Sequence, residues 1–212
     1  MPELTIAIAK GRLQAEALEL FAKAGMPLSG DSESRCLARS DETGRSRYIF
    51  VKPSDVPVYV EHGVADCGLV GLDVLLEYQA DVLQPLSLPI GRCQIVIAGP
   101  MNKQKNGYAM LRVATKYPHI TSKHFGERGQ PVEIIQLSGS VELAPGLGLA
   151  DCIVDLVETG RTLRENGLRV MEVIAESTAR LIVNRASYHL KAQTINGLIA
   201  ALKKQTQAQG EA

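Results

Sequence analysis

Several properties that would place this 212-residue chain in a specialised class are absent from its sequence. Lysine plus arginine and aspartate plus glutamate both total 23, so no net charge attracts nucleic acid or an anionic membrane. No run of eighteen apolar residues occurs, which excludes a membrane-spanning helix. The N-terminal stretch MPELTIAIAKGRL has its acid before a brief apolar run and its bases after it, the reverse of a secretory signal. We therefore expect a cytoplasmic protein that binds neither nucleic acid nor a membrane.

Cysteine is also scarce, and its spacing excludes two further kinds of site. The four cysteines are Cys36, Cys67, Cys93 and Cys152. They form no CxxC pair and have no histidine at ligand spacing, so neither a disulfide nor a thiolate metal site is expected. We interpret them as small core residues. The histidines likewise form no metal or nucleophile pattern.

What the chain does contain is a regular alternation of short β-branched runs and helix-length segments, within a composition that is 45% hydrophobic. The expected strands are 4–9, 65–71, 93–99, 112–117, 132–137, 152–157, 169–177 and 179–184, with a hairpin at 35–52. The expected helices are 13–25, 54–63, 72–78, 120–129, 159–167 and 187–204, with one more between 99 and 112. Strands separated by helices predict parallel pairing through right-handed crossovers.

This pattern starts afresh at Cys93, which predicts an α/β fold of two lobes with a central cleft, like the type II periplasmic binding proteins. Lobe I would comprise residues 1–92 and 178–212, because the last helix is expected to return to it. Lobe II would comprise residues 93–177. Periodicity alone does not prove the return crossing.

The most informative segment is DCIVDLVETGRTLRENG, at residues 151–167. A buried-looking strand ends in Asp155 and Glu158, whose carboxylates are suited to ribose hydroxyls. Gly160 then permits a tight turn. Beside this turn, the backbone N–H groups at the start of a helix and the hydroxyls of Thr159 and Thr162 can donate hydrogen bonds to a phosphate. An ordinary helix cap, in which a threonine satisfies backbone donors, is an equally simple interpretation of these residues taken one by one.

A second candidate is the loop Lys10-Gly11-Arg12, between the first strand and the first helix. Two cations beside a glycine turn at a helix start suit a polyphosphate, and ligands gather at such positions in α/β sheets. The alternative is two solvated surface charges.

With these residues, the sequence resembles the ATP phosphoribosyltransferase family. The family signature is matched by Glu142, Gly148, Ala150, Ile153, Asp155, Leu156, Thr159, Gly160, Thr162 and Leu163. The resemblance extends to segments 6–13, 51–77, 112–118 and 138–145, and so covers nearly the whole chain.

The resemblance implies an enzyme that transfers phosphoribosyl from phosphoribosyl pyrophosphate to N1 of ATP adenine, in the first step of histidine biosynthesis. The chain ends where the catalytic core of the family ends. It therefore resembles the short form, whose catalytic subunits form dimers in a hetero-octamer with a regulatory subunit similar to histidyl-tRNA synthetase. The implied cofactor is Mg²⁺, bound mainly through substrate phosphates rather than by protein ligands.

The resemblance also implies roles for individual residues. Phosphoribosyl pyrophosphate would contact Asp155, Glu158, Thr159, Gly160, Arg161 and Thr162. ATP would contact Lys10, Gly11, Arg12, Arg35, Arg47, Gly71 and Ser140. Arg12 and Arg35 would be catalytic, because they would also contact the departing pyrophosphate.

Three alternatives remain at this point. A phosphoribosyltransferase with another acceptor would share the 155–163 segment, since that segment is suited to phosphoribose rather than to the acceptor. A solute-binding protein would share the two lobes, but the chain has no export signal and would not need the acid-then-TGRT string. A catalytically silent subunit would not need so complete a signature.

Overall fold

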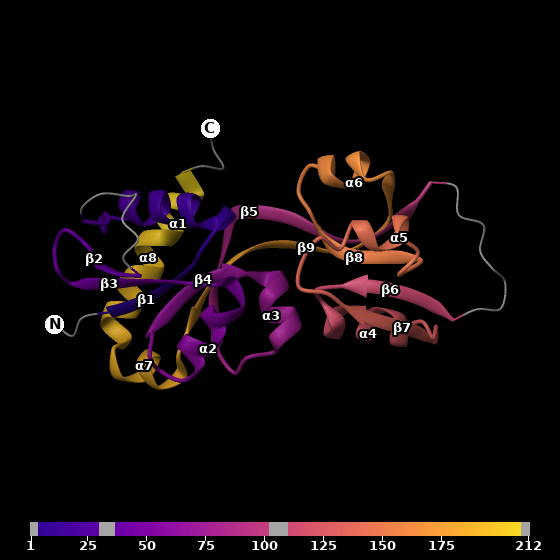
Figure 1. Ribbon diagram of the computed structural model, residues 1–212. Coiled ribbons are helices and arrows are strands. Elements are labelled where there is room, and N and C mark those ends of the chain that lie inside the picture. Colours follow the sequence, from indigo (N-terminus) through magenta and orange to yellow (C-terminus); the bar gives the residue numbers. More distant parts are fainter. Residues whose placement is uncertain (1–3, 30–36, 102–109, 209–212) are drawn as a thin grey trace. The chain divides into compact units, whose positions relative to one another are not determined.

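The computed structural model describes residues 4–29, 37–101 and 110–208. The chain divides into two compact units. Unit 1 comprises Met1–Gly91 and Thr178–Ala212, and unit 2 comprises Arg92–Ser177. Figure 1 shows the elements of each unit.

Unit 1 is a mixed sheet with helices on it. Its strands are β1 (Leu4–Ala9), β2 (Ala38–Ser40), β3 (Ser46–Val51), β4 (Cys67–Gly71) and the last part of β9 (Leu168–Val183), in the order β2-β3-β1-β4-β9. Its helices are α1 (Arg12–Lys23), α2 (Val56–Glu61), α3 (Leu72–Tyr78), α7 (Arg185–Leu190) and α8 (Ala192–Ala208), with a short 3-10 helix at Pro53–Asp55. Strand β1 runs parallel to β3 and β4, whereas the β2/β3 and β4/β9 pairs are antiparallel.

The core of unit 1 depends on close approach between helices and sheet. Helix α1 contacts both β1 and α8, and Ile195, Leu198 and Leu202 of α8 are buried, as the amphipathic pattern predicts. On β4, a Cβ at Gly68 would lie 2.8 Å from a methyl group of Val56. Glycine at this position therefore lets α2 pack directly on the strand.

Unit 2 also has mixed strand pairing, in the order β5-β8-β6-β7. Its strands are the last part of β5 (Leu83–Pro100), β6 (Leu111–Thr115), β7 (Val132–Gln136) and β8 (Cys152–Val157), together with the first part of β9. Its helices are α4 (Pro118–Glu127), α5 (Leu143–Gly146) and α6 (Arg161–Glu165). Strand β6 is parallel to β7 and β8, and β5 is antiparallel to β8.

Two apolar clusters cover the two faces of the strands in unit 2. One contains Ala114 and Ile153 with Leu163 of α6, and the other contains Val113 with Phe125 of α4. Figure 1 shows α5 and α6 on one side of β6 and β8, with α4 on the other. Alternate residues of the strands therefore face different helices.

The structure corrects three features of the predicted pattern. The pairing is mixed rather than parallel throughout. Strand β5 begins at Leu83 rather than at residue 93, and the strands predicted at 169–177 and 179–184 are one strand, β9. Each of these two long strands crosses a boundary between the units. The first half of β5 was missed because much of Leu83–Arg92 is exposed and forms no buried apolar run in the sequence.

The predicted helix at 187–204 is two helices, because α7 ends at Leu190 and α8 starts at Ala192. Asn184 caps α7: its side chain accepts a hydrogen bond from the Ser187 backbone N–H at 2.9 Å. The helix predicted at 54–63 begins as the 3-10 helix Pro53–Asp55, and no side chain caps α2. The helix predicted between 99 and 112 falls largely outside the described residues.

Cys67, Cys93 and Cys152 are buried, as their interpretation as core residues predicts, and Cys36 lies outside the described residues. None of the helices in the described part of the chain is long and apolar enough to span a membrane.

Candidate functional site

The carboxyl ends of three parallel strands meet at one edge of unit 2. Thr115, the last residue of β6, lies level with Gln136 of β7 and with Val154 of β8. The segments that follow these strands therefore begin side by side. They bring Lys116, Ser140 and the 155–162 segment to the same edge, where ligands bind in open α/β sheets.

The turn after β8 has the geometry that the glycine predicts. Gly160 adopts φ 70° and ψ 12°, in the left-handed region, and α6 begins at the next residue. No side chain caps α6. Within the described residues, the hydroxyls of Thr159 and Thr162 have no hydrogen-bond partner. The structure therefore gives no support to the interpretation of these threonines as helix caps.

Asp155 is the buried carboxylate of this edge, with 8% of its surface exposed. Its Oδ1 accepts a hydrogen bond from the Leu156 backbone N–H at 2.9 Å. Burial raises the pKa of Asp155, the Leu156 bond and the charge of Lys116 oppose this rise, and Glu142 adds to it. Glu158, by contrast, is exposed just beyond the strand.

Two arginines extend from α6. Arg161 pairs with Glu165 one turn later, with 2.8 Å between Nε and Oε1, and both side chains are largely exposed. Arg164 Nη1 donates to the Thr159 carbonyl at 3.1 Å, which helps to hold the turn. A surface pair of this kind is weak, so Arg161 retains the freedom to meet a phosphate.

The corresponding edge of unit 1 holds the second candidate. Gly11 adopts φ 90° and ψ −141°, which other residues avoid, and Arg12 begins α1. Helix α1 has no side-chain cap and no acid in its first turn, so the positive end of its dipole is not neutralised locally. The Lys10 N–H donates to the Val51 carbonyl at 2.8 Å, which places Lys52 at the same edge.

Gly71 ends β4, which is parallel to β1, and so belongs to this edge of unit 1 as well. A Cβ at Gly71 would lie 2.2 Å from Oδ1 of Asp73, a buried carboxylate. A larger residue at this position would therefore require the Asp73 side chain to move.

Three other residues were predicted to contact ATP. Arg47 lies opposite Thr5 near the amino ends of β3 and β1, so about 13 Å of strand separates it from Val51 at the carboxyl end. Ser140 belongs to unit 2, where it follows β7 at the edge that carries Asp155. Arg35 lies outside the described residues.

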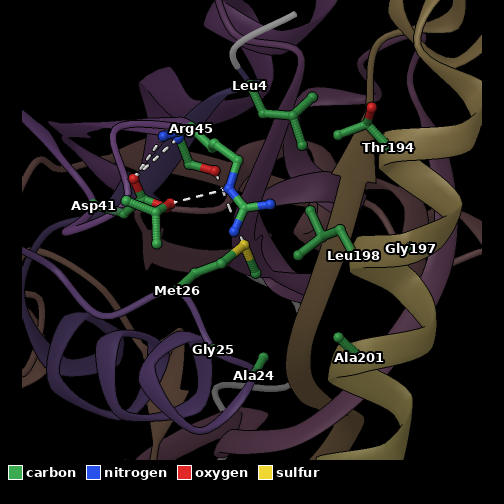
Figure 2. A pocket seen from close by; sticks show the side chains of 12 residues that line it. Leu4, Ala24, Gly25, Met26, Asp41, Arg45, Thr194, Gly197, Leu198 and Ala201 are labelled. Carbon is green, nitrogen blue, oxygen red and sulfur yellow. Dashed lines mark hydrogen bonds between the residues drawn. The ribbon is translucent and has the colours of Figure 1, made fainter. Parts of the chain in front are cut away.

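A pocket of about 210 Å³ also opens in unit 1 (Figure 2). Leu4, Met26 and Leu198 contribute apolar walls, and Arg45 extends across it. The carboxylate that lines the pocket belongs to Asp41, and it already accepts hydrogen bonds from the backbone N–H groups of Arg45 and Ser46 in the hairpin turn. The pocket lies at the amino end of β1, opposite the Lys10 loop, and neither of the two candidate segments lines it.

Sequence reasoning assigned no contact role to Lys52, Lys116 or Glu142. Each of them follows a strand that pairs in parallel, so the order of elements along the chain already placed each one after a strand end. This order identifies residues of one site only when the pairing of the strands is known, because strand order decides which strand ends are neighbours.

Comparisons with known proteins agree with the resemblance seen in the sequence. A family model described as ATP phosphoribosyltransferase matches residues 52–204. A relative from Caldanaerobacter subterraneus subsp. tengcongensis, named ATP phosphoribosyltransferase, is 49% identical over 207 residues, which cover 96% of this chain and 98% of that protein.

Two solved structures extend the comparison to the fold. A chain of the ATP phosphoribosyl transferase (HisG:HisZ) complex from Thermotoga maritima matches with a TM-score of 0.84 and 36% identity, over 97% of this chain and 99% of that chain. The periplasmic aliphatic sulphonate binding protein SsuA from Escherichia coli matches with a TM-score of 0.64 and 16% identity, over 100% and 76%. The second match concerns the fold alone and confirms the expected likeness to periplasmic binding proteins.

Proposed function

The chain belongs to the ATP phosphoribosyltransferase family, and from this premise we propose how its own residues carry out the reaction. The enzyme transfers phosphoribosyl from phosphoribosyl pyrophosphate to N1 of ATP adenine, in the first step of histidine biosynthesis. The proposals concern the roles of individual residues, the metal ion and the assembly.

In unit 2, the end of β8 and the segment after it bind the phosphoribosyl group. Asp155 and Glu158 accept hydrogen bonds from the ribose hydroxyls. Thr159, Gly160, Arg161 and Thr162 bind the 5′-phosphate through backbone N–H groups, hydroxyls and a guanidinium. The observation that carries this assignment is the left-handed turn at Gly160, followed by a helix that no side chain caps.

In unit 1, the Lys10-Gly11-Arg12 loop binds the polyphosphate of ATP and the departing pyrophosphate. The uncapped start of α1 and two exposed cations support this role. Lys52 adds a third positive charge at the same edge. The role of Arg35 rests on the family resemblance.

The transfer needs no protein nucleophile. N1 of adenine attacks the anomeric carbon as pyrophosphate leaves, and the configuration inverts. Holding the two substrates in alignment contributes up to about 7–11 kcal/mol to lowering the barrier. The carboxylates of Asp155 and Glu158 also place negative potential near the ribose, which becomes cationic in the transition state.

Mg²⁺ is the proposed cofactor. Among the described residues, no three histidine, cysteine, aspartate or glutamate side chains gather into a metal site. Mg²⁺ commonly takes one or two carboxylates and completes its shell with substrate phosphates and water, which fits Asp155 and Glu158 beside a bound pyrophosphate. The bound ion would neutralise charge on the leaving pyrophosphate.

We further propose that the chain is the short form of the enzyme. It matches the Thermotoga maritima chain almost end to end, and that chain is part of a HisG:HisZ complex. By analogy, this chain would form dimers within a hetero-octamer with a regulatory subunit similar to histidyl-tRNA synthetase. A cytoplasmic location fits its unbridged buried cysteines.

The test is to incubate the chain with ATP, phosphoribosyl pyrophosphate and Mg²⁺, with and without the regulatory subunit, and to measure phosphoribosyl-ATP by mass spectrometry. Free adenine and other bases replace ATP in parallel reactions. Among these acceptors, only ATP is expected to give product. Product with a free base but not with ATP would contradict the assignment of the acceptor.

A further inference from the structure

Strand β5 leaves unit 1 immediately after Gly91, and this residue has an unusual conformation for a strand. Gly91 adopts φ 64°, in the left-handed region that other residues avoid, so the extended backbone is interrupted there. Gly91 is also buried, whereas Arg92, which follows it, is exposed. The buried backbone N–H of Gly91 needs a hydrogen-bond partner.

That partner is a side chain of α1, 75 residues earlier in the sequence. The Gly91 N–H donates to Oε2 of Glu16 at 3.1 Å. On the same helix, Leu13 packs against Gly91, since a Cβ built at position 91 would lie 2.8 Å from Cδ1 of Leu13. Two residues from the first two turns of α1 therefore contact one point of β5.

These contacts adjoin the polyphosphate loop. Helix α1 begins at Arg12, so Leu13 is the next residue and Glu16 lies one turn further, on the same face as Arg12. No side chain caps the start of α1. The bond from Gly91 and the packing of Leu13 hold this uncapped start against β5. A helix terminus binds an anion more tightly when its N–H groups are already in position, because ordering them during binding costs affinity.

We propose that Glu16 is a positioning residue of the polyphosphate loop, which fixes the start of α1 to Gly91 so that the Lys10-Gly11-Arg12 loop is ordered before ATP binds. This inference rests on the proposed role of that loop in binding ATP. Glu16 itself does not contact the substrate. It acts through the helix whose first residue is Arg12.

The alternative is that Glu16 is an ordinary surface carboxylate, since its side chain is largely exposed. The two roles predict effects of opposite sign. The negative charge of Glu16 lies one turn from Arg12, so by charge alone its removal should strengthen polyphosphate binding. If the hydrogen bond to Gly91 positions the loop, its loss should weaken ATP binding instead. Glutamine separates the two contributions, because its amide oxygen accepts a hydrogen bond but carries no charge.

The test compares four variants of α1. Glu16→Met and Glu16→Ala remove the acceptor, and Glu16→Gln keeps it. Glu19→Met is the matched control, because Glu19 is an exposed carboxylate of the same helix that pairs with Lys23. The dissociation constant of ATP with Mg²⁺ is measured by calorimetry without phosphoribosyl pyrophosphate, well below the melting temperature of each variant. Amide hydrogen exchange at Gly91 is measured on the same samples, and phosphoribosyl-ATP formation is measured with the regulatory subunit present.

Glu16→Met and Glu16→Ala should raise the dissociation constant of ATP about three- to tenfold and should speed amide exchange at Gly91. Glu16→Gln should bind ATP as tightly as the wild type or up to about twofold more tightly, with wild-type exchange at Gly91. Glu19→Met should follow the wild type. Alanine is the best helix former, so a residue that merely stabilised α1 would cause no loss of affinity in Glu16→Ala.

The failure of this role is distinguishable from the failure of the proposed function. Equal ATP affinities in Glu16→Met and Glu19→Met overturn the role of Glu16, as does an affinity in Glu16→Gln as low as that in Glu16→Met. In both cases product formation by the wild type leaves the proposed function standing. If the wild type neither binds ATP nor forms product, the proposed function fails and the role of Glu16 fails with it. Circular dichroism checks folding, and if Glu16→Met does not fold, the comparison of Glu16→Ala with Glu19→Met decides by itself.

Discussion

Lys191 and Asp66 are 125 residues apart in the sequence, yet Lys191 Nζ lies 2.8 Å from Asp66 Oδ2. The same carboxylate accepts hydrogen bonds from the Thr5 backbone N–H at 2.8 Å and from the Ser187 hydroxyl at 2.7 Å. Asp66 is buried, and its carboxylate connects β1, α7 and the residue before α8 in unit 1 through these three hydrogen bonds. This relationship makes the C-terminal helices part of unit 1.

Lys191→Met should therefore destabilise the fold by about 1–3 kcal/mol, because a nearly buried carboxylate loses its charged partner. Chemical denaturation of the variant and the wild type measures the change. Lys23→Met is the control, since it breaks only the exposed Lys23–Glu19 pair on α1 and should leave the midpoint almost unchanged. Equal midpoints for the two variants would show that the Asp66 network contributes little.

Thr162→Val tests whether the threonine binds substrate or caps a helix. Its hydroxyl has no partner among the described residues, so the melting temperature should be nearly unchanged. The dissociation constant for phosphoribosyl pyrophosphate should rise about two- to tenfold, because one hydrogen bond to the phosphate is lost. A lower melting temperature with unchanged affinity would instead support the capping role.

Gly160→Ala tests the left-handed turn. Alanine at φ 70° costs about 1–2 kcal/mol, which the loop would avoid by changing its conformation. Binding of phosphoribosyl pyrophosphate, measured by calorimetry, should weaken severalfold. Gly167→Ala is a matched control, because Gly167 also has φ 70° and lies after α6, outside the proposed contacts. Equal losses of affinity in both variants would point to general strain rather than to a phosphate site.

Arg12→Gln tests the polyphosphate loop of unit 1. Removing a charge-assisted contact to phosphate should raise the KM for ATP about ten- to hundredfold. The difference in KM for ATP between Arg12→Gln and the wild type should become smaller as salt is added, because exposed charges are screened. Steady-state kinetics at two ionic strengths, with Lys23→Gln as the control for charge on α1, provide the measurement. An unchanged KM would indicate that Arg12 is a solvated surface residue that does not contact ATP.

Gly197→Ala should stabilise the protein. Gly197 lies inside α8 and is exposed. A Cβ at this position would meet no atom within 4 Å beyond the backbone of its own helix, so alanine adds helix propensity without a clash. The expected gain is about 0.5–1 kcal/mol, or about 1–4 °C in Tm, with unchanged activity. Gly91→Ala should do the opposite, because Gly91 has φ 64° and its Cβ would lie 2.8 Å from Leu13. A Tm decrease in Gly197→Ala would contradict the open space seen beside α8.

Much of the secondary structure was predictable from local pattern. Strands β1 and β8 and helix α3 have the predicted bounds, because apolar periodicity and turn residues act within a few positions of each other. The Gly160 turn was predictable for the same reason: its signal is a residue type in a short segment.

Other features depend on contacts that no local pattern encodes. The direction of β9 against β4, the continuity of β5, and the separation of Arg47 from Lys10 follow from which strands pair and in which register. These choices depend on burial against distant residues, as in the pairing of Lys191 with Asp66. The sequence by itself determined the family, the reaction and the residues that carry its signature. Only the tertiary structure decided which strand ends are neighbours, and thus that Lys116 and Asp155 lie at one edge, because proximity across a sheet is set by strand order rather than by distance along the chain.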